Sequence, residues 1–111
     1  MELLAENRSG MLVICARGER IDAAGAIQFK DRMRELVQDP APRVVLDLSQ
    51  VMFLDSSGLG AVVAVMKALA PARNLELSGL TATVEKVFRL TRMDSVFTIH
   101  PSVPDGLRDA G

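Results

Sequence analysis

Residues 43–60 read RVVLDLSQVMFLDSSGLG, and this stretch decides the fold of the chain. The apolar, β-branched run at residues 43–48 predicts a strand that is covered on at least one face. After the polar tetrapeptide at residues 55–58, apolar side chains recur at three- and four-residue intervals, which predicts a helix. The predicted apolar face of that helix consists of Leu59, Val62, Val63, Met66 and Leu69. The tetrapeptide therefore lies at the N-terminus of a helix.

The segments before this stretch predict two strands and one helix. Residues 2–7 and 11–17 flank a short polar link that contains a glycine, a pattern typical of a β-hairpin. A helix is predicted from Asp22, which can cap its N-terminus. Its predicted apolar face consists of Ala26, Phe29, Met33, Leu36 and Val37. Pro40 and Pro42 end this helix, because proline lacks an N–H and disfavours helical backbone in the residue before it.

The segments after the stretch predict two further strands and another helix. Residues 71–74 break the second helix, and residues 75–77 alternate as in a strand. Thr81 can cap a third helix, whose predicted buried residues are Val84, Val87 and Phe88. Residues 96–99 are the last strand candidate, and residues 105–110 are a candidate for a brief terminal helix.

The order ββαβαβαβ(α) predicts one α/β domain over residues 1–111. The first helix joins two strands, which indicates a βαβ crossover and therefore parallel pairing of those strands. Together with the antiparallel hairpin, this predicts a mixed sheet of four to five strands with helices packed mainly on one face.

The composition argues against several classes of function. Thirteen basic and fourteen acidic residues give a net charge of −1, whereas a nucleic-acid partner requires a clustered basic face. The longest apolar run, around residues 59–69, is interrupted by Gly60 and Lys67 and is too short to span a bilayer. We therefore expect a cytoplasmic protein with no nucleic-acid partner and no membrane partner. The single cysteine, Cys15, lies in an apolar run and is expected to be a small buried hydrophobe.

The sequence contains no convincing catalytic set. An enzyme of this size needs a nucleophile with a base, two carboxylates in different environments, or a metal cluster. His100, the only histidine, lies beside Pro101 and is expected to be a partly exposed residue at a strand end. Asp47 and Asp55 have no Cys, His or third acid at a ligand-like spacing, and neither glycine-rich phosphate-binding motif occurs. We expect a protein that is not an enzyme and that needs no metal or cofactor.

The tetrapeptide at residues 55–58 has the properties of a helix start that tolerates an anion. A helix N-terminus offers unpaired N–H groups and a partial positive charge, and Asp55 or Ser56 can accept a hydrogen bond from one of those groups. Gly58 and Gly60 weaken the first turn, which indicates that another backbone approaches closely there. A simple capping cluster explains the same residues, and from spacing alone that plainer interpretation is favoured.

Together with its neighbours, the tetrapeptide resembles the signature of a known family. Residues 44–49 and 53–60 are similar to the motif of bacterial anti-sigma factor antagonists, which are STAS-domain proteins. The likeness extends to the opening hairpin, to residues 18–22 and to residues 90–97, so that it covers nearly the whole chain. It implies a STAS fold and a single STAS domain over residues 1–111.

The resemblance implies a phosphorylation switch at Ser56. In this family, the serine directly after the aspartate is phosphorylated by a serine kinase that is also the anti-sigma factor, and a serine phosphatase restores the binding form. Ser57 is the alternative phosphorylation site. The implied partner-binding surface consists of Asp22, Asp55, Ser56, Ser57, Gly58, Leu59 and Gly60.

Two functions are compatible with the resemblance. In the first, a monomeric anti-sigma factor antagonist binds the kinase while Ser56 is unphosphorylated. In the alternative, the chain is a STAS adaptor subunit of a transport or signalling complex and is not phosphorylated. The chain departs from the family in two places, since residues 18–22 space the early glycine and aspartate more widely, and Arg92 stands where many relatives have a glycine at a left-handed helix end.

Overall fold

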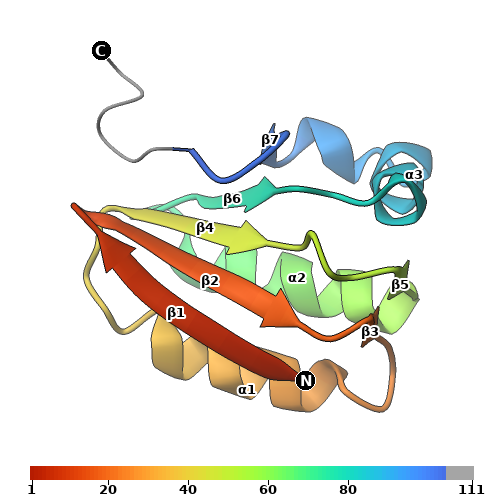
Figure 1. The fold of residues 1–111 in the computed structure, drawn as a ribbon, viewed down its shortest axis with the longest axis horizontal. Coiled ribbons are helices and arrows are strands. Elements are labelled where there is room, and N and C mark those ends of the chain that lie inside the picture. The colour runs from red at the N-terminus through yellow and green to blue at the C-terminus, as the bar shows by residue number, and fades with distance from the viewer. Residues whose placement is uncertain (105–111) are drawn as a thin grey trace.

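A five-stranded mixed sheet forms the centre of the computed structural model, which describes residues 1–104 (Figure 1). The strand order is β1 (Glu2–Arg8), β2 (Met11–Arg17), β4 (Arg43–Asp47), β6 (Leu75–Ser78) and β7 (Thr98–His100). β1 and β2 form the predicted antiparallel hairpin, and the remaining neighbours pair in parallel. The predicted mixed sheet and the βαβ crossover are confirmed.

Helices cover one face of this sheet. Within the described residues they are α1 (Ala26–Leu36), α2 (Ser56–Leu69), α3 (Ala82–Leu90) and the 3-10 helix η1 (Met93–Ser95). α1 and α2 lie side by side behind the central strands, and α3 lies beyond the carboxyl end of β6 (Figure 1). A second, two-stranded parallel sheet consists of β3 (Arg20–Ile21) and β5 (Phe53–Leu54).

The main core lies between the sheet and the helices. Side chains alternate along β2, so that Leu12 and Ile14 join this core while Met11 and Val13 point to the outer face. On the outer face, the latter two pack with Val45 and Val103 in a smaller cluster. Because both faces of β2 are covered, its sequence is a nearly continuous apolar run.

Helix α1 begins later than the sequence predicts. Its N-cap is Gly25, and Asp22 lies one turn earlier. The Asp22 carboxylate accepts a hydrogen bond from the Gly25 N–H at 3.3 Å, and the Asp22 carbonyl oxygen accepts one from the Ala26 N–H at 2.9 Å. The predicted helix start at Asp22 is wrong, because its side chain caps a separate turn that leads into the helix, and both uses of an aspartate look alike in a sequence.

Helix α2 is rotated relative to the predicted apolar face. Its buried residues are Gly58, Ala61, Val62, Val65 and Leu69, whereas Leu59, Val63 and Met66 are half-buried at the edge of the core. The predicted face is therefore only partly correct. The helix is apolar on most of its sides, so the spacing of apolar residues does not fix its rotation.

The C-terminal part of the described chain differs from the prediction in detail. Thr81 caps α3 as predicted, and Val84 and Phe88 are buried, whereas Val87 is half-buried. The last strand, β7, begins at Thr98 because η1 precedes it. The predicted terminal helix at residues 105–110 lies outside the described residues.

Arg92 ends the α3 segment in the left-handed conformation that the family resemblance implies, with φ of 61° and ψ of 17°. Arg92→Gly should therefore raise the free energy of unfolding by roughly 0.5–1 kcal/mol, because glycine adopts this backbone without steric cost. Urea unfolding followed by circular dichroism measures the change. Arg92→Ala is the matched control, since it removes the same side chain but keeps the Cβ atom, and a gain of equal size in both variants would contradict the explanation.

The outer face of the sheet carries an ion-pair cluster around Glu76. Arg43 donates to both carboxylate oxygens, from Nη2 at 2.7 Å and from Nε at 3.0 Å. The Nε2 atom of His100 lies 2.7 Å from the Oε1 atom of Glu76. His100 is half-buried at the end of β7, as expected, and the cluster links the three strands β4, β6 and β7.

This cluster gives the fold a defined response to acid. The hydrogen bond from Arg43, with a smaller contribution from His100, holds the pKa of Glu76 below its ordinary value. The ionised Glu76 side chain therefore stabilises the fold fully above the unfolded-state pKa of about 4.3. This stabilisation is lost as the pH falls through the lower folded-state pKa. We expect Glu76→Gln to flatten the loss of unfolding free energy between about pH 5 and pH 3. Urea unfolding across this range measures the slope, with exposed Glu85→Gln as the control, and unchanged slopes in Glu76→Gln would refute the expectation.

Cys15 also lies on the outer face, and it is half-exposed rather than buried. The expected full burial is wrong, because the outer face is only partly covered at the carboxyl end of β2. Desolvation and the nearby charge of Asp47 raise the pKa of the Cys15 thiol, which keeps it protonated near neutral pH.

Candidate functional site

The pairing of β3 with β5 brings two distant loops together at the start of α2. The two strands run in parallel, so the chain leaves both at the same edge. Asp22 directly follows β3, and Asp55 directly follows β5 and precedes α2. The sequence did not reveal either strand, because two residues are too few to show alternation.

Asp55 is the N-cap of α2 and fixes the geometry of this site. Its Oδ1 atom accepts a hydrogen bond from the Gly58 N–H at 2.8 Å. Its Oδ2 atom accepts one from the Ala23 N–H at 3.2 Å. A single carboxylate therefore joins the first turn of α2 to the loop before α1, and of the two capping candidates, Asp55 and Ser56, Asp55 is the cap.

Gly58 lies where the two segments are closest. A Cβ atom at this position would overlap the carbonyl oxygen of Ile21 and lie 2.9 Å from its carbonyl carbon. The predicted close backbone approach is thus confirmed at Gly58. At Gly60 it is not, since this residue is exposed and an added Cβ would meet nothing within 4 Å. The packing of the described chain therefore gives no reason for a glycine at position 60.

Ser56 and Ser57 are both exposed in the first turn of α2. Among the described residues, neither hydroxyl group has a hydrogen-bond partner, because the capping role belongs to Asp55. Both hydroxyl groups are accordingly open to an incoming enzyme. Leu59, which follows them, is half-buried against the core and contributes less to the exposed surface.

Arg20 and Phe53 belong to the same edge, and the sequence analysis missed them. The Nε atom of Arg20 lies 3.2 Å from the Oδ2 atom of Asp22, and its guanidinium carbon lies 4.2 Å above the centre of the Phe53 ring. The hydrogen bond from Arg20 lowers the pKa of Asp22. Arg20 and Asp22 are two residues apart, so their side chains lie on the same side of an extended segment. Their contact would have been predictable if the sequence had indicated a strand at residues 20–21.

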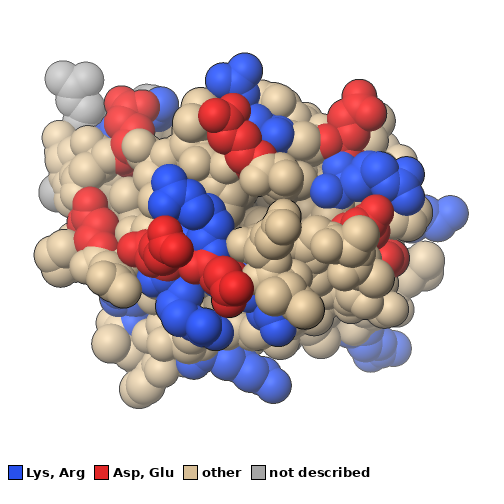
Figure 2. All heavy atoms as spheres, turned by 90° about the horizontal axis from the view of Figure 1, so that it is seen from below, with Lys and Arg blue, Asp and Glu red and all other residues tan. Residues whose placement is uncertain are grey.

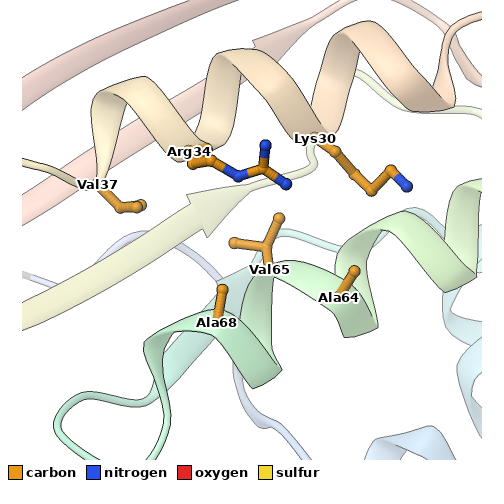
Figure 3. Close-up of a pocket in the computed structure, with 6 residues that line it drawn as sticks. All are labelled: Lys30, Arg34, Val37, Ala64, Val65 and Ala68. Atoms are coloured by element: carbon orange, nitrogen blue, oxygen red, sulfur yellow. The ribbon is translucent and has the colours of Figure 1, made fainter.

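A shallow groove lies between α1 and α2 (Figure 3). Its floor is apolar, and Lys30 and Arg34 extend over it from α1. The other residues of the lining are Val37, Ala64, Val65 and Ala68. The groove thus offers a partner an apolar surface with a positive edge, on the helix that begins with Ser56.

Charges of both signs are intermixed on the face seen in Figure 2, with no extended field of one sign. Within residues 1–104, no group of three or more His, Cys, Asp or Glu side chains is arranged to hold a metal ion. In the same part of the chain, none of the helices has the length and apolar character needed to cross a membrane.

The site lies within a fold that known proteins share. A family model described as STAS domain matches residues 2–106, which is nearly the whole chain. The chain belongs to the STAS domain family. This confirms the family that the motif at residues 53–60 resembles.

Relatives of this STAS chain include proteins named for anti-sigma factor antagonism. The chain is 32% identical over 100 residues to a Bordetella bronchiseptica protein that carries the name anti-sigma factor antagonist BtrV, covering 89% of this chain and 85% of the relative. An anti-sigma factor antagonist from Mycobacterium paratuberculosis is 28% identical, with a TM-score of 0.84 and coverage of 96% of this chain and 91% of that one. The Bacillus protein SpoIIAA in its phosphorylated form is 21% identical, with a TM-score of 0.68 and coverage of 99% and 100%, and shows the common fold. The chain is thus a STAS protein of the anti-sigma factor antagonist kind.

Proposed function

We propose that this STAS chain is a partner switch controlled by phosphorylation at Ser56. In its unmodified form it binds a serine kinase that acts as an anti-sigma factor, and phosphorylation releases it. The observation that carries the proposal is the exposed, unpartnered hydroxyl of Ser56 at a helix N-terminus that Asp55 already caps. Support also comes from BtrV, named as an anti-sigma factor antagonist, and from SpoIIAA, which occurs in a phosphorylated form.

The phosphate acts on docking and leaves the fold unchanged. Phosphoserine carries a charge of about −1.5 to −2 at neutral pH, and a helix N-terminus stabilises an anion. Asp55 keeps its two hydrogen bonds after modification, because neither involves the Ser56 hydroxyl. The main effect is therefore repulsion and desolvation at the partner interface.

The partner contacts the exposed part of the predicted surface. Ser56, Ser57 and Gly60 are exposed, whereas buried Gly58 serves to shape the turn. An exposed glycine with open space above it lets the partner backbone approach α2 closely. The groove beside α1 extends this surface along the helix.

The chain performs this role as a binding protein and not as an enzyme. The residues that meet at the edge act as a cap, a close-packed glycine and an ion pair, and none of them forms a nucleophile with a base. The chemistry of the switch is therefore supplied by the kinase and by a serine phosphatase, and the chain itself needs no cofactor.

Incubation with ATP and the kinase encoded nearest to its gene tests the proposal. We expect one phosphate per chain on Ser56, detected by mass spectrometry of proteolytic fragments. Ser56→Ala should abolish the modification, whereas Ser57→Ala is the matched control and should retain it. Modification of Ser57 alone would mean that Ser57, and not Ser56, is the switch residue. Stable binding to a partner without any modification would favour the adaptor function.

A further inference from the structure

We infer that Arg20 is the counter-ion of phosphorylated Ser56 and that it exchanges its ion pair with Asp22 for one with the phosphate. This inference rests on the proposed function and adds a residue that the sequence motif does not contain. It follows from three features of the β3–β5 edge: the position of Arg20, its unused donors and the excess of negative charge that modification creates.

The strand register brings Arg20 within reach of Ser56. Arg20 pairs with Phe53, and Ser56 lies three residues after Phe53, at the start of α2. From the rise of a strand and the spacing between strands, the Cα atoms of Arg20 and Ser56 are on the order of 10 Å apart. An arginine side chain and a phosphoserine side chain that extend toward each other cover this distance. Both residues lie on the exposed edge, so the approach requires no opening of the core.

The guanidinium group of Arg20 has N–H donors that are not used in the unmodified chain. Among residues 1–104 its guanidinium makes one hydrogen bond, from Nε to Asp22, so that both terminal amino groups lack a protein acceptor. The flat face of the group rests on the ring of Phe53, which holds the cation in place without using its N–H donors. A phosphate needs such a pair of free donors for a two-pronged ion pair.

Phosphorylation adds negative charge beside the Asp22 and Asp55 carboxylates, and Arg20 is the cation at this edge that compensates for it. The modified serine follows Asp55 directly, and the Asp22 loop is hydrogen-bonded to the same carboxylate through Ala23. The Asp55 carboxylate is engaged by two backbone N–H groups. The Asp22 carboxylate accepts one hydrogen bond from the Gly25 N–H, and Arg20 is its cationic partner. When a dianion arrives beside these two carboxylates, the more highly charged acceptor competes for the guanidinium.

Phosphoserine placed at position 56 by genetic encoding tests the exchange without any kinase. The phosphate is titrated by ³¹P NMR, starting from a second pKa of about 6. We expect Arg20→Gln to raise that pKa by about half a unit, roughly a threefold change in proton affinity, because the cation favours the dianion. Arg32→Gln, which removes an exposed arginine of α1, is the matched control and should leave the titration unchanged.

A second measurement follows Asp22 and does not depend on a substitution. Since Arg20 lowers the pKa of Asp22 in the unmodified chain, loss of this partner to the phosphate should raise the pKa, as observed by carboxyl ¹³C NMR. If the phosphate titrates identically with and without Arg20, and Asp22 titrates identically with and without the phosphate, the inference is wrong. A kinase that fails to modify Ser56 would instead refute the proposed function, because the encoded phosphoserine bypasses that step.

Discussion

Gly58→Ala is expected to destabilise the protein by about 3 kcal/mol or more, the largest stability effect of any single substitution at this site. The new methyl group would overlap the carbonyl oxygen of Ile21, and this backbone cannot move freely because β3 is paired with β5. Urea unfolding at equilibrium measures the loss. Where the variant is too unstable for a native baseline, the unfolded fraction in the absence of urea gives a lower limit.

Gly60→Ala is the matched control and should have the opposite sign. It lies two residues further along the same helix, and an added Cβ there meets nothing. Alanine should therefore stabilise α2 by about 0.5–1 kcal/mol through helix propensity. A cost of similar size at both positions would mean that general helix effects, and not the contact with Ile21, govern Gly58.

Phosphorylation of Ser56 is expected to weaken binding of the kinase partner by at least about 100-fold, equivalent to roughly 3 kcal/mol. The negative charge is added at the centre of the proposed interface, where it must lose water on docking. Calorimetric titration of the partner with the encoded phosphoserine form gives the ratio of the two dissociation constants. The melting temperature of the modified chain should stay unchanged, since the Asp55 cap is intact.

Phosphoserine at position 9 provides the control for this measurement. Ser9 is exposed in the β1–β2 turn, at the opposite end of the sheet from β3 and β5 (Figure 1). It adds the same charge far from the proposed interface and should change the affinity less than twofold, an effect on the order of 0.4 kcal/mol. Equal losses at both positions would indicate a general charge effect, and an unchanged affinity at position 56 would count against the switch.

The sequence predicts the architecture well because long segments have strong periodicity. Apolar spacing and turn residues indicate the hairpin, the crossover at residues 17–43 and the start of α2. The rotation of α2 was not predictable in this way. It follows from the contact between Gly58 and Ile21, which joins residues 37 positions apart and has no local signature.

The candidate site was predicted in part for the same reason. Asp55, Ser56 and Gly58 lie together in one motif, and Asp22 enters through the family resemblance. The roles of Arg20 and Phe53 were not predicted, since both residues belong to strands of only two residues. They come into contact only because β3 pairs with β5. The sequence therefore predicts site residues that lie together in one motif, and the structure adds the site residues that folding brings together from distant segments.

The carboxylate of Asp55, with one oxygen bonded to each of two segments, fixes the backbone of the site without the exposed side chains beside it. Substitutions at the exposed positions 57 and 60 leave both of its hydrogen bonds untouched. The exposed surface can therefore be altered at positions 57 and 60 while the arrangement of the two loops is kept.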